Sequence, residues 1–298
     1  MTTSAEAIAL RRPHPGAFAR ARRFAGKHTL TVFGVLALAY LLLPIAIVVL
    51  FSFNDPAGRF NYTWEGFTFG HWANPFGVPG LLEAMETSLK VAGIATAAAT
   101  VLGTLVALAL VRHGFRGRGA TNFLIFMPMT TPEIVMGASL LTLFLNLGVA
   151  TGFWTIVIAH VMFDISYVVV TVKARLVGFD RHLEEAAMDL GANEWVTFRK
   201  VTLPLIAPGI LAASLLAFAL SIDDFVITNF NSGTTVTFPL YVWGAARVGV
   251  PPQVNVIGTI IFVVAVGLMV GSILWQRRRE KAEAEAQALA ATGFAGTT

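Results

Sequence analysis

Six long apolar segments constrain this chain more than any other feature of its sequence. Their approximate ranges are 29–53, 88–111, 121–147, 153–171, 203–229 and 254–275. A bilayer core of about 30 Å takes roughly 20 apolar residues per helix, and each segment is long enough to cross it. No block of soluble-domain size lies between the segments. We therefore predict an all-α integral membrane protein with six transmembrane helices.

The composition agrees with a chain that is solvated mostly by lipid. Only 13% of the residues are charged and 56% are hydrophobic, whereas soluble domains carry about 25% charged residues. The sequence has no cysteine, which excludes disulfides, zinc fingers and Cys-ligated clusters. Small residues recur every four positions from Ala95 to Ala107, a pattern that predicts close helix packing.

The basic residues predict the orientation of the chain. All but three of the 21 Lys and Arg residues lie in four stretches: residues 1–28, 112–120, 172–202 and the tail after 275. Cytoplasmic loops of membrane proteins are rich in Lys and Arg, so we expect both termini in the cytoplasm. This explains the net charge of +4 without a nucleic-acid partner. We divide the chain into a basic tail (1–28), a six-span domain (29–275) and a second tail (276–298).

The cytoplasmic loop 178–203 is the most informative segment. Leu183, Ala186 and Leu190 recur at helical spacing, and Gly191 can end such a helix. A second short segment follows before Pro204 opens the next span. We predict two short helices around a sharp turn. The acidic residues of the loop disfavour an anionic membrane surface, so a groove on a partner protein is the preferred docking site.

The order of residues from Glu185 to Pro204 resembles the EAA loop of ABC importer permeases. The family pattern is Glu-Ala-Ala, three residues, Gly, nine residues, Ile, one residue, Leu-Pro, and Val201 replaces the Ile here. In that family the loop is the coupling helix, which sits in a cleft of the ATP-binding subunit. The resemblance therefore assigns ATPase coupling to eight residues: Glu184, Glu185, Ala186, Ala187, Asp189, Gly191, Leu203 and Pro204.

Further stretches are similar to the permeases of spermidine/putrescine importers. They include Pro132–Met136, Ser221–Phe225 and Val248–Asn255. This resemblance implies a type I ABC importer permease fold in a bacterial inner membrane. It also implies a second permease subunit, two ATP-binding cassette subunits and an extracytoplasmic polyamine-binding protein as partners. ATP and Mg²⁺ would be bound by the ATPase, and this chain would hold no cofactor.

Acidic residues within the apolar segments are candidates for a cation path, because ionisable groups in lipid are costly and often functional. Measured along straight helices, Glu133 and Asp164 lie about 18 and 17 Å deep. Each has a simpler alternative: Glu133 can satisfy a donor freed by the Pro132 helix break, and aspartates at 223 and 224 can cap a helix end. Aromatic rings attract ammonium groups, although most in spans only pack. The candidates are Glu133, Asp164, Tyr167, Asp223 and Asp224.

The sequence offers no motif for catalysis or metal binding. It lacks GxxxxGK[ST], HExxH and GxSxG, and its histidines are not at metal-ligand spacing. We therefore expect a transport subunit that hydrolyses no ATP itself. Three alternatives remain: an ABC permease for ferric iron or another small solute, an ion-coupled secondary transporter, and a membrane-bound enzyme. The secondary transporter leaves the EAA-like loop unexplained.

Overall fold

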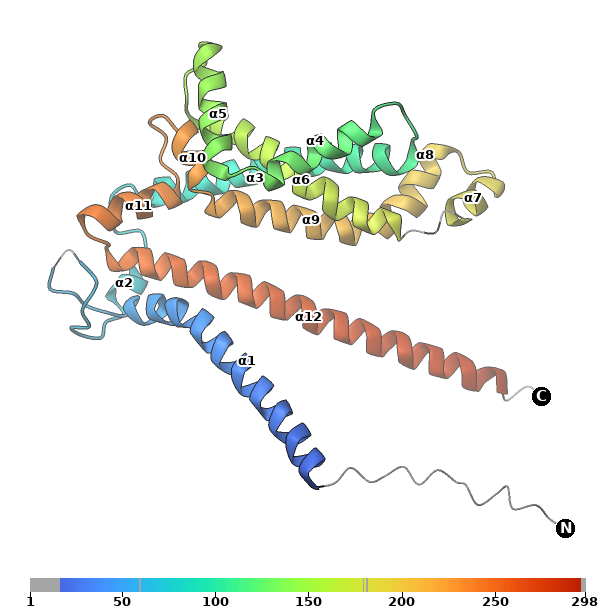
Figure 1. Ribbon diagram of the computed structural model, residues 1–298, viewed down its shortest axis with the longest axis horizontal. Helices are drawn as coiled ribbons and strands as arrows, with labels where there is room; N and C mark the ends of the chain where they lie inside the picture. Colours follow the sequence, from blue (N-terminus) through green and yellow to red (C-terminus); the bar gives the residue numbers. More distant parts are fainter. Residues whose placement is uncertain (1–16, 59, 179, 181, 296–298) are drawn as a thin grey trace. The chain divides into compact units, whose positions relative to one another are not determined.

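The computed structural model describes residues 17–58, 60–178, 180 and 182–295, and these residues are mostly helical (Figure 1). The predicted tails therefore lie partly outside the described residues. Two compact units are distinguished. One unit combines the two ends of the chain, up to Pro75 and from Pro252 onward, and the other runs from Phe76 to Pro251.

The first unit contains the first and last predicted spans. They lie within α1 (Ala17–Phe51) and α12 (Pro252–Ala295), which pack against each other. The loop between α1 and the short α2 (Gly70–Ala73) is organised by the buried Asn54. Its side chain donates to Asn61 Oδ1 at 2.6 Å and accepts the Glu65 N–H at 2.8 Å. The loop between α1 and α2 is thus folded around the side-chain amide of Asn54.

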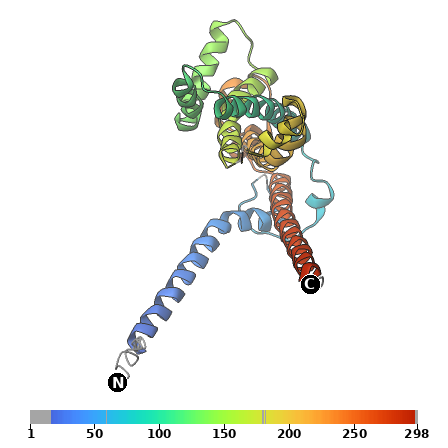
Figure 2. The ribbon, with the colours of Figure 1, turned by 90° about the vertical axis from the view of Figure 1, so that its right-hand side faces the viewer.

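The core of the second unit is a group of three helices: α3 (Leu81–Arg112), α6 (Phe153–Val177) and α9 (Leu203–Asp223). All three pack against one another, and Figures 1 and 2 show them side by side. The small residues of α3 are fully buried at Ala95 and Ala99. A Cβ atom at Gly103 would lie only 2.6 Å from Val168 Cγ1. The predicted close packing is therefore confirmed.

The third predicted span is not one straight helix. It is divided into α4 (Arg118–Thr130) and α5 (Glu133–Asn146), which meet at an angle of 108°. Thr131 has extended backbone angles (φ −79°, ψ 133°), the conformation favoured for a residue before proline. Pro132 also lacks the N–H that a continuous helix requires. The depth of Glu133 that we derived from a straight helix is therefore wrong.

The fifth predicted segment is also divided, because α9 ends at Asp223 and a short α10 (Val226–Asn231) follows. The next helix, α11 (Phe238–Val248), leads back to the first unit. Among the described residues, five helices are long and apolar enough to cross a membrane, or six if α4 and α5 form one broken span. The helical membrane fold agrees with the prediction.

Candidate functional site

The loop before α9 forms the predicted pair of short helices. They are α7 (His182–Asp189) and α8 (Glu194–Thr197), and a π-helical turn, η1 (Phe198–Thr202), joins α8 directly to α9. Residues 179 and 181 lie outside the described residues. Because η1 continues into α9, the loop is joined to the three-helix core by uninterrupted helical backbone.

Gly191 makes the turn between the two short helices. Its φ is +88°, a conformation that costs most L-residues about 1 kcal/mol or more. The Gly191 N–H donates to the Met188 carbonyl at 2.9 Å, and the Ala192 N–H donates to the Ala187 carbonyl at 3.1 Å. These two bonds are the Schellman pattern. The predicted role of Gly191 as the helix end is confirmed.

The loop exposes apolar side chains as well as carboxylates. Leu190 is 90% exposed and Trp195 is 67% exposed, and the Trp195 ring stacks on Phe198 at 5.9 Å. Ala186 and Asp189 of α7 are also exposed. Leu203 and Pro204 are the first two residues of α9, directly after η1.

Two adjacent glutamates of α7 have different surroundings. Glu185 is 62% exposed and contacts His182 Nδ1 at 3.0 Å. Glu184 is only 15% exposed and forms an ion pair with Arg112, the last residue of α3. The hydroxyl of Thr202 also donates to the same Glu184 oxygen. The eight residues that the resemblance assigned to coupling therefore do not form one uniform surface.

The candidate cation-path residues are also divided by the fold. Asp224 accepts the Thr228 N–H at 2.8 Å and the Thr228 hydroxyl at 2.7 Å, so it caps the first turn of α10. His160 Nε2 lies 3.3 Å from Asp224 Oδ2, and His160 Nδ1 lies 2.6 Å from the Ser221 hydroxyl. The capping alternative therefore describes Asp224 in this structure.

Asp164 is fully buried on α6, one turn after His160. Neither of its carboxylate oxygens has a hydrogen-bond partner within the described part of the chain. An unpaired carboxylate is costly in a buried site. Glu133 and Asp223 are instead exposed, and the half-buried Tyr167 packs against Phe163 at 4.9 Å between ring centres. The five candidates thus differ in exposure, and their role in a cation path stays a prediction.

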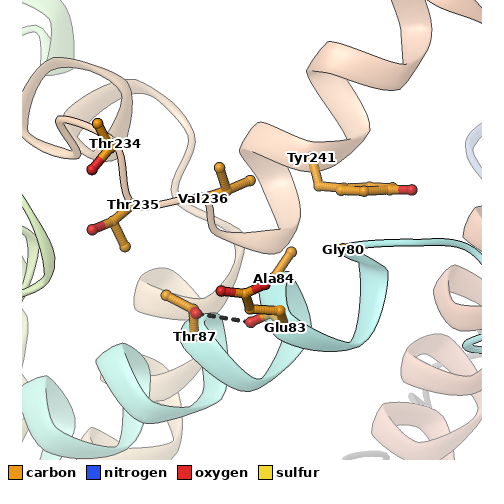
Figure 3. A pocket seen from close by; sticks show the side chains of 8 residues that line it. All are labelled: Gly80, Glu83, Ala84, Thr87, Thr234, Thr235, Val236 and Tyr241. Carbon is orange, nitrogen blue, oxygen red and sulfur yellow. Dashed lines mark hydrogen bonds between the residues drawn. The ribbon is translucent and has the colours of Figure 1, made fainter.

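A cavity of about 350 Å³ lies between the N-terminal end of α3 and the segment that leads into α11 (Figure 3). Glu83 and Thr87 line it from α3, and Thr234 and Thr235 line it from the other side. The Glu83 carboxylate has no ion-pair partner among the described residues. The carboxylate and hydroxyl oxygens of this cavity are groups that accept hydrogen bonds from an ammonium.

Tyr241 of α11 adds an aromatic ring to this cavity. Its hydroxyl donates to the Pro79 carbonyl at 3.3 Å, and burial raises the pKa of Tyr241 above its ordinary value. Aromatic rings attract cations. Glu83 was not among the candidates predicted from the sequence, because it lies outside the predicted second span and the threonines opposite it lie about 150 residues away in the sequence. An acidic residue beside the end of a predicted span is the signal that could have indicated it.

No group of three or more His, Asp or Glu side chains suited to a metal ion occurs in the described ranges.

Residues 99–281 match the family model of the binding-protein-dependent transport system inner membrane component. This chain belongs to that family. The match includes α7, Gly191, α6, α9 and the second part of α3, so the loop before α9 is part of the family domain.

Characterised members of this transport family resemble the chain along most of its length. It is 41% identical over 241 residues to the spermidine/putrescine transport system permease protein PotC of Haemophilus influenzae, covering 80% of this chain and 93% of that protein. It is 40% identical over 250 residues to the putrescine transport system permease protein PotI of Escherichia coli, covering 81% and 87%.

Solved structures of ABC transporters share the fold. A bacterial ABC transporter involved in the import of the acidic polysaccharide alginate matches with a TM-score of 0.60 and 19% identity, covering 87% of this chain and 97% of that chain. The MetNI methionine ABC transporter matches with a TM-score of 0.52 and 16% identity, covering 64% and 92%. These findings confirm the predicted permease fold and the inner-membrane location, while the cytoplasmic position of both termini stays a prediction.

Proposed function

We propose that this chain is the permease subunit of an ATP-driven importer for polyamines such as spermidine or putrescine. The observation that carries this proposal is the 41% identity over 241 residues to a spermidine/putrescine permease. The chain would form half of the translocation path. Its partners would be a second permease, two ATP-binding cassette subunits and an extracytoplasmic polyamine-binding protein. ATP and Mg²⁺ would be held by the ATPase subunits, and this chain would contribute neither a cofactor site nor a catalytic residue.

The loop of α7 and α8 would dock onto an ATPase subunit. The exposed Leu190 and Trp195 side chains support this assignment, because large apolar groups that find no cover in one chain are typical of contact surfaces. Glu185 would add a charged contact at the edge. When the ATPase pair closes on ATP, the loop would move, and η1 would carry that movement into α9.

The exposed carboxylates of Glu133 and Asp223 are our candidates for direct contact with the ammonium groups of the cargo in this conformation. Tyr167 would contribute an aromatic face. Asp164 and Asp224 would meet the cargo only after α6 and α9 separate, because both side chains are buried here. The cavity at Glu83 and Tyr241 would offer a first contact for one ammonium group at the extracytoplasmic end.

The test is uptake by the complete importer in proteoliposomes, with labelled spermidine or putrescine delivered by the binding protein. We expect uptake that requires ATP, stops with an ATPase subunit that cannot hydrolyse it, and is insensitive to a protonophore. Uptake that persists without ATP and collapses with the protonophore would instead establish a secondary transporter. Uptake of ferric iron with no uptake of polyamines would overturn the choice of cargo and leave the ATP-driven class intact.

A further inference from the structure

The ion pair between Arg112 and Glu184 joins two elements that are 72 residues apart in the sequence. Arg112 is the last residue of α3, and Glu184 lies in the first turn of α7. Thr202, the residue directly before α9, donates its hydroxyl to the same Glu184 oxygen. The Arg112 guanidinium also lies 3.2 Å from the Thr202 hydroxyl. Three helical elements therefore meet at one carboxylate oxygen.

This junction is partly withdrawn from solvent. Thr202 is fully buried, and the side chains of Glu184 and Arg112 are 15% and 28% exposed. Another ion pair of α3, between Lys90 and Glu86, is more than half exposed on both sides. An exposed pair is screened by water and contributes little, whereas removing one partner of a buried pair leaves an uncompensated charge. Loss of Glu184 or Arg112 should therefore disturb its surroundings more than loss of Glu86.

The neighbouring Glu185 shows that the junction is separate from the docking surface. Adjacent residues of a helix point about 100° apart, so Glu184 and Glu185 point in different directions. Glu185 is exposed and free to meet another protein, whereas Glu184 faces α3 and η1. One glutamate of α7 is thus directed outward and the other is directed into the chain's own core.

We propose that Glu184 is a positioning residue that fastens α7 to both α3 and α9, so that ATPase movement reaches two core helices together. This inference rests on the proposed function. Without Glu184, the loop stays joined to α9 through η1, but its ion pair to α3 is lost. The loop can then move while α3 lags behind. The importer would still hydrolyse ATP, and a smaller share of that hydrolysis would move cargo.

The experiment measures ATP hydrolysed per polyamine imported by the complete importer in proteoliposomes. The variants are Glu184→Gln, Arg112→Gln and the charge exchange Arg112→Glu with Glu184→Arg. We expect each single variant to raise the ratio at least about fivefold, the low end of typical coupling between sites. The charge exchange should restore part of the wild-type ratio. The matched control is Glu86→Gln, which breaks the exposed pair on the same helix and should leave the ratio unchanged.

A purely structural role predicts a different result: hydrolysis and uptake would fall in equal proportion, with the ratio preserved, and this would overturn the inference. If the charge variants fail to assemble, Thr202→Val decides, because it removes only the hydroxyl from the junction. A raised ratio supports the inference and an unchanged ratio overturns it. Wild-type uptake is measured first: if the wild-type importer takes up no polyamine, the proposed function fails. If it does and Glu184→Gln keeps the wild-type ratio, only the positioning role fails.

Discussion

Asp224 Oδ2 lies 2.8 Å from the backbone nitrogen of Thr228, four residues further along the chain. The same oxygen accepts the Thr228 hydroxyl and faces His160 Nε2. Asp224 therefore holds the start of α10 and ties it to α6. A carboxylate that fills this structural role is already occupied by partners, which separates it from the exposed Asp223 beside it.

We expect Asp224→Ala to destabilise the chain by about 1 kcal/mol or more, because a helix-capping acceptor is lost. Asp224→Asn should cost less, since its single amide oxygen can still accept one of the two N–H groups of α10. Thermal unfolding of the purified complex in detergent measures both changes. Equal destabilisation by Ala and Asn would show that the negative charge beside His160 matters more than the cap.

Asp164→Asn should lower polyamine uptake by about tenfold, because the proposed hydrogen bond from a cargo ammonium to the charged carboxylate, worth about 1.5–3 kcal/mol, would be weakened. The amide keeps the shape of the buried carboxylate and removes its charge. Uptake is compared at equal amounts of assembled importer. Ser166→Ala, a buried polar change two residues away on the same helix, is the control. If the Asn variant takes up polyamine at the wild-type rate, Asp164 is not part of the cation path.

Gly191→Ala should impair ATPase docking, because φ at this position is +88°. No atom lies within 4 Å of the added Cβ, so the cost is backbone strain of about 1–2 kcal/mol rather than a collision. Binding of the ATPase subunit to permease complexes in nanodiscs is the measurement. Gly178→Ala is the matched control. Gly178 follows the last residue of α6, at the start of the same loop, and its φ of −85° is one that alanine adopts without strain. Comparable binding by the two variants would show that the left-handed turn is dispensable.

Gly103→Ala should destabilise the three-helix core by about 1–3 kcal/mol, the usual range for overpacking. The new Cβ would lie 2.6 Å from Val168 Cγ1 and 3.3 Å from the Ile165 carbonyl oxygen. Gly93→Ala in the same helix meets no atom within 4 Å and should not destabilise it. The variants are compared by their unfolding as the concentration of a denaturing detergent is raised. A neutral result at Gly103 would mean that α3 and α6 can move apart without loss.

Glu83→Gln should raise the KM for polyamine uptake by about tenfold with little change in the maximal rate. The proposed hydrogen bond from a cargo ammonium to the Glu83 carboxylate would become a weaker bond to a neutral amide. The control is Glu86→Gln, three residues along α3, whose carboxylate is paired with Lys90. Initial rates over a range of polyamine-loaded binding protein separate KM from maximal rate. A fall in maximal rate alone would place Glu83 outside the substrate-binding steps.

Local signals in the sequence predicted much of the fold. The length of the apolar segments marked the spans, whereas the orientation inferred from the basic loops stays a prediction. Gly191 was predictable as a turn because a glycine directly after an amphipathic segment is a local signal, and the helix end depends only on neighbours in the chain. The burial of Ala99 was likewise visible as a spacing of small residues.

Other features depend on contacts between distant residues, and the sequence alone did not show them. The 108° bend at Thr131 and Pro132 required knowledge of how α4 and α5 pack, because a proline can kink a helix or end it. The pairing of Arg112 with Glu184 joins residues 72 positions apart. Sequence similarity grouped Glu184 with Glu185, and only the three-dimensional arrangement separates them. The Glu83 cavity was likewise not predictable, because it brings Glu83 together with residues about 150 positions away in the sequence.

The Schellman turn at Gly191 is closed by the loop's own backbone hydrogen bonds. Association with a partner normally costs free energy for every side chain and backbone segment that must be ordered. In the proposed docking, the turn at Gly191 would already be formed before the encounter. The affinity of the loop would then depend on the few side chains that it presents, and Trp195→Ala would weaken the binding of the ATPase subunit.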